Sequence, residues 1–140
     1  MSLKELRAKM LNHLKWLEDE ESGERLDLSG VNLSKTYLRY ADLREANLSG
    51  ANLRYADLIG ANLSGANLSG ADLTGALLCG ADLAETNLSH ANFKGSMLIG
   101  ADMRGAKMLD TRFGGADTNK SDWSNLSDVF PCPVFNDKED

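Results

Sequence analysis

The sequence predicts an all-β solenoid, in which short extended segments and corners wind the chain into a stack of coils. Three observations carry this prediction. The chain divides into 20 consecutive pentapeptides from Leu26 to Asn125, without insertion or deletion. Leu occupies the third position in 14 of these units, and Ala stands two residues earlier in 13. Asn or Asp lies between those two positions in 15 units, and Gly ends 11 units.

Each pentapeptide is interpreted as one extended side and one corner. A period of five matches neither an α-helix nor the strict alternation of a long strand. In extended backbone the Ala and Leu of a unit, two positions apart, point the same way. Gly tolerates positive φ, and Asn or Asp bonds the local backbone, which suits the remaining positions to a corner. A single coil cannot bury its Leu residues, so successive coils must stack.

The most regular units lie in the middle of the chain. Residues 61–65 and 66–70 read Ala-Asn-Leu-Ser-Gly, and residues 71–75 read Ala-Asp-Leu-Thr-Gly. They resemble the A(D/N)LXX signature of the pentapeptide repeat family, and the likeness covers all 20 units. The resemblance implies a right-handed quadrilateral β-helix with four units per coil. On that basis the repeat makes five coils, which rise about 24 Å at about 4.8 Å per layer.

Four units per coil also imply four interior columns, each advancing by 20 residues. The columns begin at Leu28, Leu33, Leu38 and Leu43. Each buried Leu contributes about 1.5–3 kcal/mol. Toward the end of the repeat other residues take these places, which indicates a less regular last part: Phe93, Met103, Met108, Phe113, Thr118 and Trp123.

We expect three segments: a capping helix and linker over residues 1–25, the β-helix over 26–125, and a C-terminal cap with a frayed tail over 126–140. Ser2 and Glu5 form a capping-box signal for a helix that starts at Leu3. Its apolar stripe is expected to cover the first coil rather than lie on a membrane, and the acidic run Glu18–Glu24 reads as the linker. The residues expected to cover the last coil are Val129, Phe130, Val134 and Phe135.

Composition excludes several classes of function. With 140 residues the chain suits one domain, and its net charge of −6 argues against direct binding to nucleic acid. No apolar run approaches the roughly 20 residues that span a membrane, and no secretory signal precedes the repeat. Two Cys cannot make a disulfide framework, so we expect a cytoplasmic protein.

The outward residues sort into four faces, which we name the Leu28, Leu33, Leu38 and Leu43 faces after the first interior residue of each. The Leu38 face is neutral and displays an outer strip, here called the apolar strip: Tyr37, Ile59, Leu77, Cys79, Met97 and Ile99. The Leu43 face nets −4, and its acidic residues, here called the acidic column, are Asp42, Glu45, Asp82, Glu85, Asp102 and Asp122. The Leu33 face nets +3.

Three functions remain open at this point. An exposed apolar patch on a soluble protein favours a protein-binding scaffold, including a homodimer through the strip, unless the C-terminal tail covers it. Some members of the resembled family bind DNA gyrase by mimicking DNA, and the acidic column would serve that purpose. The short repeat, the lack of loops that interrupt it and its modest charge depart from those members. The third hypothesis is an isolated or regularised repeat domain without a partner of its own.

Catalytic and metal sites are not expected. His13 and His90 lie in different segments without neighbouring Cys or acidic residues at metal spacing, and both are expected on the surface. Cys79 and Cys132 form no CxxC motif and lie far apart along the repeat. The Ser ladder of the Leu28 face has no base beside it. The sequence therefore predicts no enzyme, no cofactor and no metal.

Overall fold

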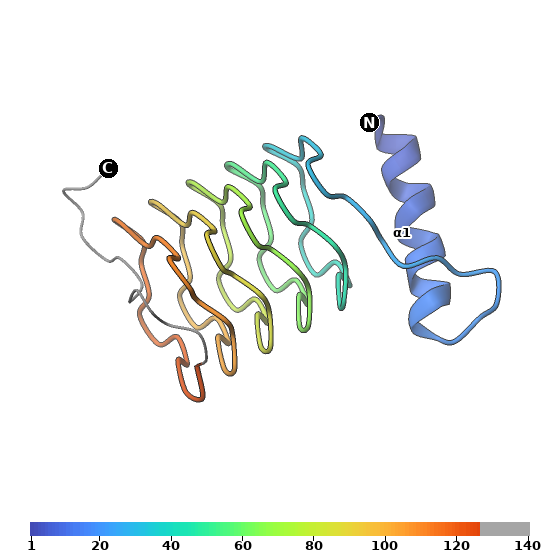
Figure 1. The fold of residues 1–140 in the computed structure, drawn as a ribbon. Coiled ribbons are helices and arrows are strands. Elements are labelled where there is room, and N and C mark those ends of the chain that lie inside the picture. Colours follow the sequence, from blue (N-terminus) through green and yellow to red (C-terminus); the bar gives the residue numbers. More distant parts are fainter. Residues whose placement is uncertain (127–140) are drawn as a thin grey trace.

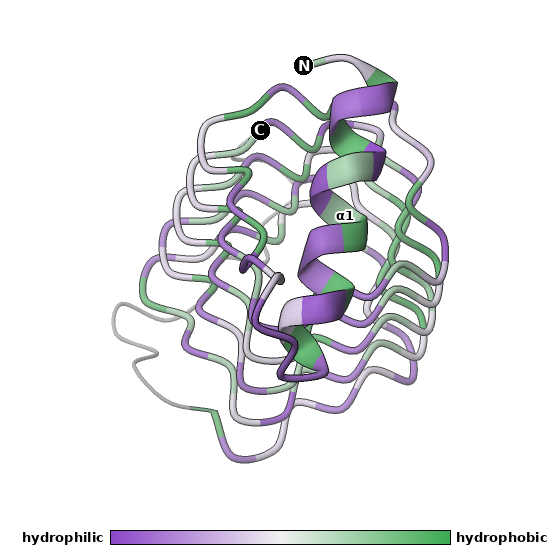
Figure 2. Ribbon diagram, turned by 90° about the vertical axis from the view of Figure 1, so that its right-hand side faces the viewer, coloured by the Kyte–Doolittle hydropathy of each residue, from purple (hydrophilic) through white to green (hydrophobic). Residues whose placement is uncertain are grey.

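A computed structural model describes residues 1–126 and shows one helix followed by a regular solenoid (Figure 1). The helix, α1, spans Leu3–Leu17. After it the chain winds through successive coils whose extended sides are single parallel bridges rather than long strands. Viewed along the solenoid, α1 lies across the opening of the first coil (Figure 2). The predicted C-terminal cap around Val129 to Phe135 lies outside the described residues.

Each coil contains 20 residues and four sides. All 16 bridges join residues 20 positions apart, as in the series from Asp42 through Asn62 and Asp82 to Asp102. On each side the backbone bonds in both directions; the Leu48 N–H donates to the Asn67 carbonyl at 2.7 Å, and the Asn67 N–H donates to the Ala46 carbonyl at 2.9 Å. The β-helix and the four-unit coil are confirmed.

The corners share one backbone conformation. The last residue of every unit from Gly30 to Asn125 has positive φ, whether it is one of 11 Gly or one of nine other residues. The next residue closes the turn; the Ala51 N–H, for example, donates to the Leu48 carbonyl at 3.1 Å. Positive φ at the third residue of such a turn is the type II pattern, which favours Gly. The Asn or Asp of the unit stabilises the same corner, since Asn47 Oδ1 accepts a bond from the Ser49 N–H at 3.1 Å.

The interior is filled by the predicted columns. Every Leu from Leu28 to Leu88 at the third position is buried, and the Ala side chains beside them are buried from Ala46 onward. Phe93 and Phe113 stack at 5.1 Å between ring centroids, and Trp123 meets Phe113 edge-on at 5.1 Å. Thr118 and Trp123, in the last coil, are only half-buried.

The N-terminal cap starts as predicted. Ser2 Oγ accepts a bond from the Glu5 N–H at 3.1 Å, and the Glu5 carboxylate accepts one from the Ser2 N–H at 3.0 Å. Leu6 faces the first coil and is buried. The capping box thus satisfies the N–H groups of Ser2 and Glu5 at the start of the helix.

The prediction of a surface position for His13 is wrong, because its ring is fully buried between α1 and the solenoid. Its Nδ1 accepts a bond from the Leu26 N–H at 3.0 Å, so Nε2 carries the proton and donates to the Arg44 carbonyl at 2.9 Å. The ring also stacks on Trp16 at 5.6 Å. His13 therefore bonds the helix to the first and fourth sides of the first coil. Burial lowers its pKa below the ordinary value of 6.5.

Candidate interaction surfaces

The Leu38 face brings the apolar strip together. Tyr37, Asp57, Leu77 and Met97 form one continuous series of parallel bridges, so these residues occupy successive coils on the same side. Tyr37 and Met97 are exposed, whereas the other four residues of the strip are half-buried: Ile59, Leu77, Cys79 and Ile99. The six residues therefore share one side of the solenoid, and Tyr37 and Met97 are its most exposed members.

An ion pair interrupts the strip in the second coil. Asp57 occupies the bridge position between Tyr37 and Leu77, and its carboxylate accepts a bond from Arg39 Nε at 2.6 Å. Asp57 is itself buried, while the Arg39 side chain is largely exposed. Ile59 continues the apolar surface beside the pair. The Leu38 face therefore presents apolar side chains around one charged contact.

A groove beside α1 extends the same face. It measures about 580 Å³ and is lined by residues of α1 and of the first coil, with Leu3, Leu6 and Met10 on one wall and Tyr37 and Leu38 on the other. Tyr37 is 87% exposed, the highest value among the large hydrophobic side chains of the described chain. The sequence pattern did not indicate this groove, because the residues of α1 that line it and Tyr37 lie far apart in the sequence.

The acidic column lies on the Leu43 face as predicted, but it is partly neutralised. Arg44 makes two bonds to the Asp42 carboxylate, at 2.7 and 2.8 Å, and Arg104 makes two to Asp102, at 2.7 and 2.9 Å. These bonds are the largest cause of the lowered pKa of each carboxyl. Asp122 lies 3.9 Å from Arg104.

The carboxylates of the other three acidic residues have no cation in direct contact within the described chain, although Arg25 Nε donates to the backbone carbonyl of Glu45 at 2.5 Å. Asp82 Oδ1 accepts a bond from the Ala84 N–H at 2.9 Å. The carboxylates of Glu45 and Glu85 lie over Gly65 and Gly105 of the next coil. Negative charge therefore concentrates at these three side chains rather than evenly along the column.

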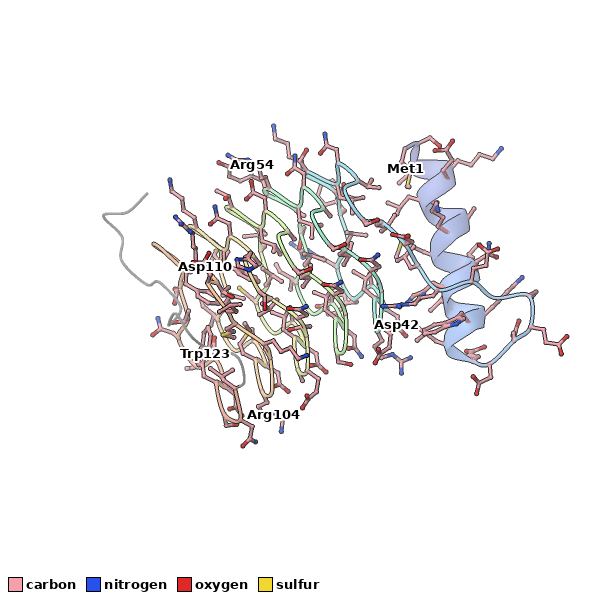
Figure 3. The ribbon with its side chains drawn as sticks, viewed as in Figure 1. Met1, Asp42, Arg54, Arg104, Asp110 and Trp123 are labelled. Carbon is pink, nitrogen blue, oxygen red and sulfur yellow. The ribbon has the colours of Figure 1, made fainter. Side chains whose placement is uncertain are left out.

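Opposite sides of the solenoid carry opposite charge. In Figure 3 Asp42 and Arg104 lie along one long side and Arg54 along the other. Arg54 pairs with Asp72 at 3.1 Å and its guanidinium carbon stands 5.8 Å from the centre of the Tyr55 ring. The basic Leu33 face and the acidic Leu43 face are thus separated by the full width of a coil.

In the part of the chain that the structure describes, the titratable and nucleophilic side chains do not converge on a reactive site. His90 is exposed and its Nδ1 lies 3.2 Å from the Asp110 carboxylate, far along the chain from buried His13. Cys79 is a free, half-buried thiol; Cys132 lies outside the described residues. Within residues 1–126, no three His, Cys, Asp or Glu side chains lie together as metal ligands would. In the same range no helix is both long and apolar enough to span a bilayer.

These features define a class: a repeat protein whose side chains are presented on four flat faces of a rigid coil. The family model described as "Pentapeptide repeats (8 copies)" matches twice, at residues 27–65 and 66–105. The chain belongs to the pentapeptide repeat family, as the signature of its units implied.

Three solved structures of pentapeptide repeat proteins are similar to this chain in sequence. HetL of the cyanobacterium Nostoc sp. strain PCC 7120, a protein involved in the regulation of heterocyst differentiation, is 28% identical over 74% of this chain and 60% of its own, with a TM-score of 0.40. Alr5209 from Nostoc PCC 7120 is 31% identical over 82% and 84% of the two chains, with a TM-score of 0.39. The thylakoid-lumen protein AT2G44920 of Arabidopsis thaliana is 31% identical over 74% and 62%, with a TM-score of 0.32.

The chain thus spans somewhat less than two thirds of the length of HetL and of the Arabidopsis protein. No curated protein matches it significantly.

Proposed function

We propose that this protein is a non-enzymatic scaffold that binds a protein partner through its Leu38 face. The observation that carries the proposal is the apolar strip, in which Leu77 and Met97 take bridge positions that belong to Asn or Asp in 15 of the 20 units. Apolar side chains gathered on one face of a soluble protein favour an interface. The strip is held on coils bonded to both neighbours, so its binding loses little conformational entropy.

The shape of the face suggests the kind of partner. The strip runs along the solenoid axis and continues into the groove beside α1. Tyr37 belongs to the strip and also lines the groove. An extended or helical segment with an apolar side would cover it lengthwise. The compartment we propose is the cytoplasm, where a free thiol such as Cys79 stays reduced.

A photo-crosslinking side chain placed at Met97 tests the proposal in cells. We expect a discrete adduct that disappears when Ile59 and Ile99 are both replaced by Lys, because these charges would lie in the same interface. The matched control is the same side chain at Ser69, half-buried on the Leu28 face. Equal adducts from both sites, or none from Met97, would contradict binding through the strip. The second result would favour a repeat domain without a partner.

A homodimer is one form of this function. If the strip joins two copies, replacing Ile59 and Ile99 by Lys converts a dimer to a monomer of 15.2 kDa in light scattering. An unchanged mass would remove this form of the proposal. Both side chains are half-buried and point outward, so circular dichroism should report an intact fold.

A second candidate is a DNA mimic directed at DNA gyrase, and the observation that favours it is the single ladder formed by Asp82, Asp102 and Asp122. Arg44 and Arg104 weigh against it, since they neutralise two members of the acidic column. A supercoiling assay with and without a quinolone tests it. Inhibition or protection that is lost in salt and in the Asp82→Lys/Glu85→Lys variant supports mimicry. Salt-insensitive activity, or none, excludes it.

A further inference from the structure

One flank of α1 carries apolar side chains that residues 1–126 leave uncovered. Leu3, Leu11 and Leu14 are 61%, 62% and 41% exposed. At about 100° per residue they fall with Arg7 and Met10 into one stripe about 100° wide. The stripe is turned about 100° from Leu6 and His13, which face the first coil. The helix therefore has two apolar sides; Leu6 and His13 of one side are buried in the cap, and of the other side only Met10 packs against the core.

The uncovered flank has the form of a helix-binding site. Arg7, Met10, Leu11 and Leu14 surround a hollow of about 310 Å³. Their spacing of i, i+3, i+4 and i+7 is that of the four residues that receive one side chain of a facing helix in knobs-into-holes packing. Arg7 and Met10 also line the larger groove beside Tyr37, so the two hollows adjoin each other along α1. A partner helix with an apolar side chain would fill it.

The charges around the stripe indicate which helix would bind there. In the first half of α1, Lys4 and Arg7 lie in or beside the stripe, whereas Lys9 and Glu5 lie on the other side of the helix. The four residues that follow the helix, 18–21, are all acidic. A second copy of α1 laid antiparallel sets the basic start of each helix against the acidic end of the other, twice over. A parallel copy would set like charges together. The surface is therefore complementary to itself in one orientation, as a two-fold interface requires.

We propose that the protein forms a two-fold symmetric dimer in which α1 pairs antiparallel with α1 of a second copy. The hollow is centred between Met10 and Leu11, so an axis at this point inserts Leu11 of each copy into the hollow of the other. The same register brings Lys4 close to the partner's Glu18. The dimer does not depend on the apolar strip or on the function proposed for it.

Disulfide trapping tests the register. In a Cys79→Ser/Cys132→Ser background, Leu11→Cys lies at the axis and forms a disulfide with its own copy, since the two Cα atoms come within about 7 Å. We expect oxidation to give a species of twice the 15.2 kDa chain mass. The matched control is Tyr55→Cys, exposed on the Leu33 face, which should remain monomeric. No crosslink at Leu11→Cys, or equal crosslinking at both positions, overturns the proposal.

Charge exchange tests the orientation in solution, by sedimentation equilibrium. An exposed ion pair contributes a factor of up to about five in affinity. Each pair occurs twice in the dimer and becomes repulsive on reversal, so Lys4→Glu and Glu18→Lys should each weaken dimerisation about tenfold. The Lys4→Glu/Glu18→Lys variant should restore it. Both changes favour the dipole of α1, so weakening would not result from loss of the helix.

Leu11→Glu removes the central contact and should weaken the dimer about 100-fold or more. A wild-type protein with the mass of a single chain at high micromolar concentration overturns the proposal, as does failure of the exchanged pair to restore the dimer. If Ile59→Lys/Ile99→Lys abolishes association while Leu11→Glu does not, the interface is the apolar strip instead.

Discussion

Replacing Gly60 by Ala should measure how much a side chain contact between two successive coils contributes to stability. Gly60 and Gly80 are corner residues of the Leu38 face, and both have φ of +66°. A Cβ at Gly80 would meet nothing within 4 Å, whereas a Cβ at Gly60 would lie 2.6 Å from Cδ1 of Tyr40. Carbon atoms in contact are separated by about 3.5–4.0 Å. The Tyr40 ring must therefore move by about 1 Å or more when Gly60 becomes Ala.

The two sites separate the backbone cost from the contact cost. Left-handed backbone costs a non-glycine residue about 1–2 kcal/mol, and the smaller entropy of the unfolded chain returns about 0.4–1 kcal/mol. Gly80→Ala should thus lower the free energy of unfolding by about 1 kcal/mol. Gly60→Ala adds the packing that Tyr40 loses, and because that ring is 76% exposed the extra loss is modest, for a total of about 2 kcal/mol.

Urea unfolding followed by circular dichroism measures both variants, in the wild-type chain and with Tyr40→Ala. In the Tyr40→Ala background the cost of Gly60→Ala should fall to that of Gly80→Ala, because no ring remains to be displaced. Equal costs at the two glycines in the wild-type chain would refute the reasoning. So would a difference between them that persists without the ring.

Three further changes test the cap and the core. The pKa of His13 is lowered in the folded protein, so the unfolded chain binds the proton first and stability is lost as pH falls from about 6.5 through the folded value; the urea midpoint should drop between about pH 7.5 and pH 5. His13→Gln should reduce that dependence, and an unchanged dependence would contradict the assignment. Phe93→Ala should cost about 3–5 kcal/mol in urea unfolding and Phe93→Leu less than about 1.5 kcal/mol, since Leu fills this column in earlier coils; equal losses would show that the Phe93–Phe113 stack matters more than volume. Ser96→Ala should raise the melting temperature, because the buried Ser96 hydroxyl has no hydrogen-bond partner in the described chain, and a lower melting temperature would indicate a bonded hydroxyl.

The coil could be predicted because one physical constraint acts on every unit. Residues like Leu48 and Ala46 recur every five positions because both point into the core. Such a period can be recognised in the sequence without knowing which distant segments are in contact. The number of sides did not follow from the period alone, and came from the family resemblance. The capping box followed from Ser2 and Glu5, which lie three residues apart and interact locally.

The misplaced residues are those whose environment is made by distant segments. His13 is buried by Leu26 and Arg44, which lie 13 and 31 residues further along the chain, and its polarity alone indicates a surface position. Asp42 and Arg44 stand in one unit, so their pairing was open to prediction, but the face charge was counted without it. The groove beside Tyr37 exists only because α1 is shifted over the first coil.

At several corners a side chain of one coil lies over a glycine in the next coil. Tyr40 and Glu45 keep positive φ without being Gly, and each places its side chain over a Gly 20 residues later. Tyr55 does the same over Gly75. These glycines thus allow the positive φ of their own turn and also leave room for a side chain of the preceding coil.

Because every bridge joins residues 20 positions apart, the number of residues that precede a side chain decides on which face and in which coil it lies. Removing residues 61–80 would join Gly60 to Ala81 and return all later residues to their own faces, one layer nearer to α1. Removing only residues 66–70 would turn the rest of the solenoid by one side, so that Met97 would move to the basic face and the later acidic residues to the side that carries the strip. Insertions or deletions of 20 residues therefore leave each binding face intact. Insertions or deletions of 5, 10 or 15 residues would keep the interior columns filled but move the later side chains to other faces.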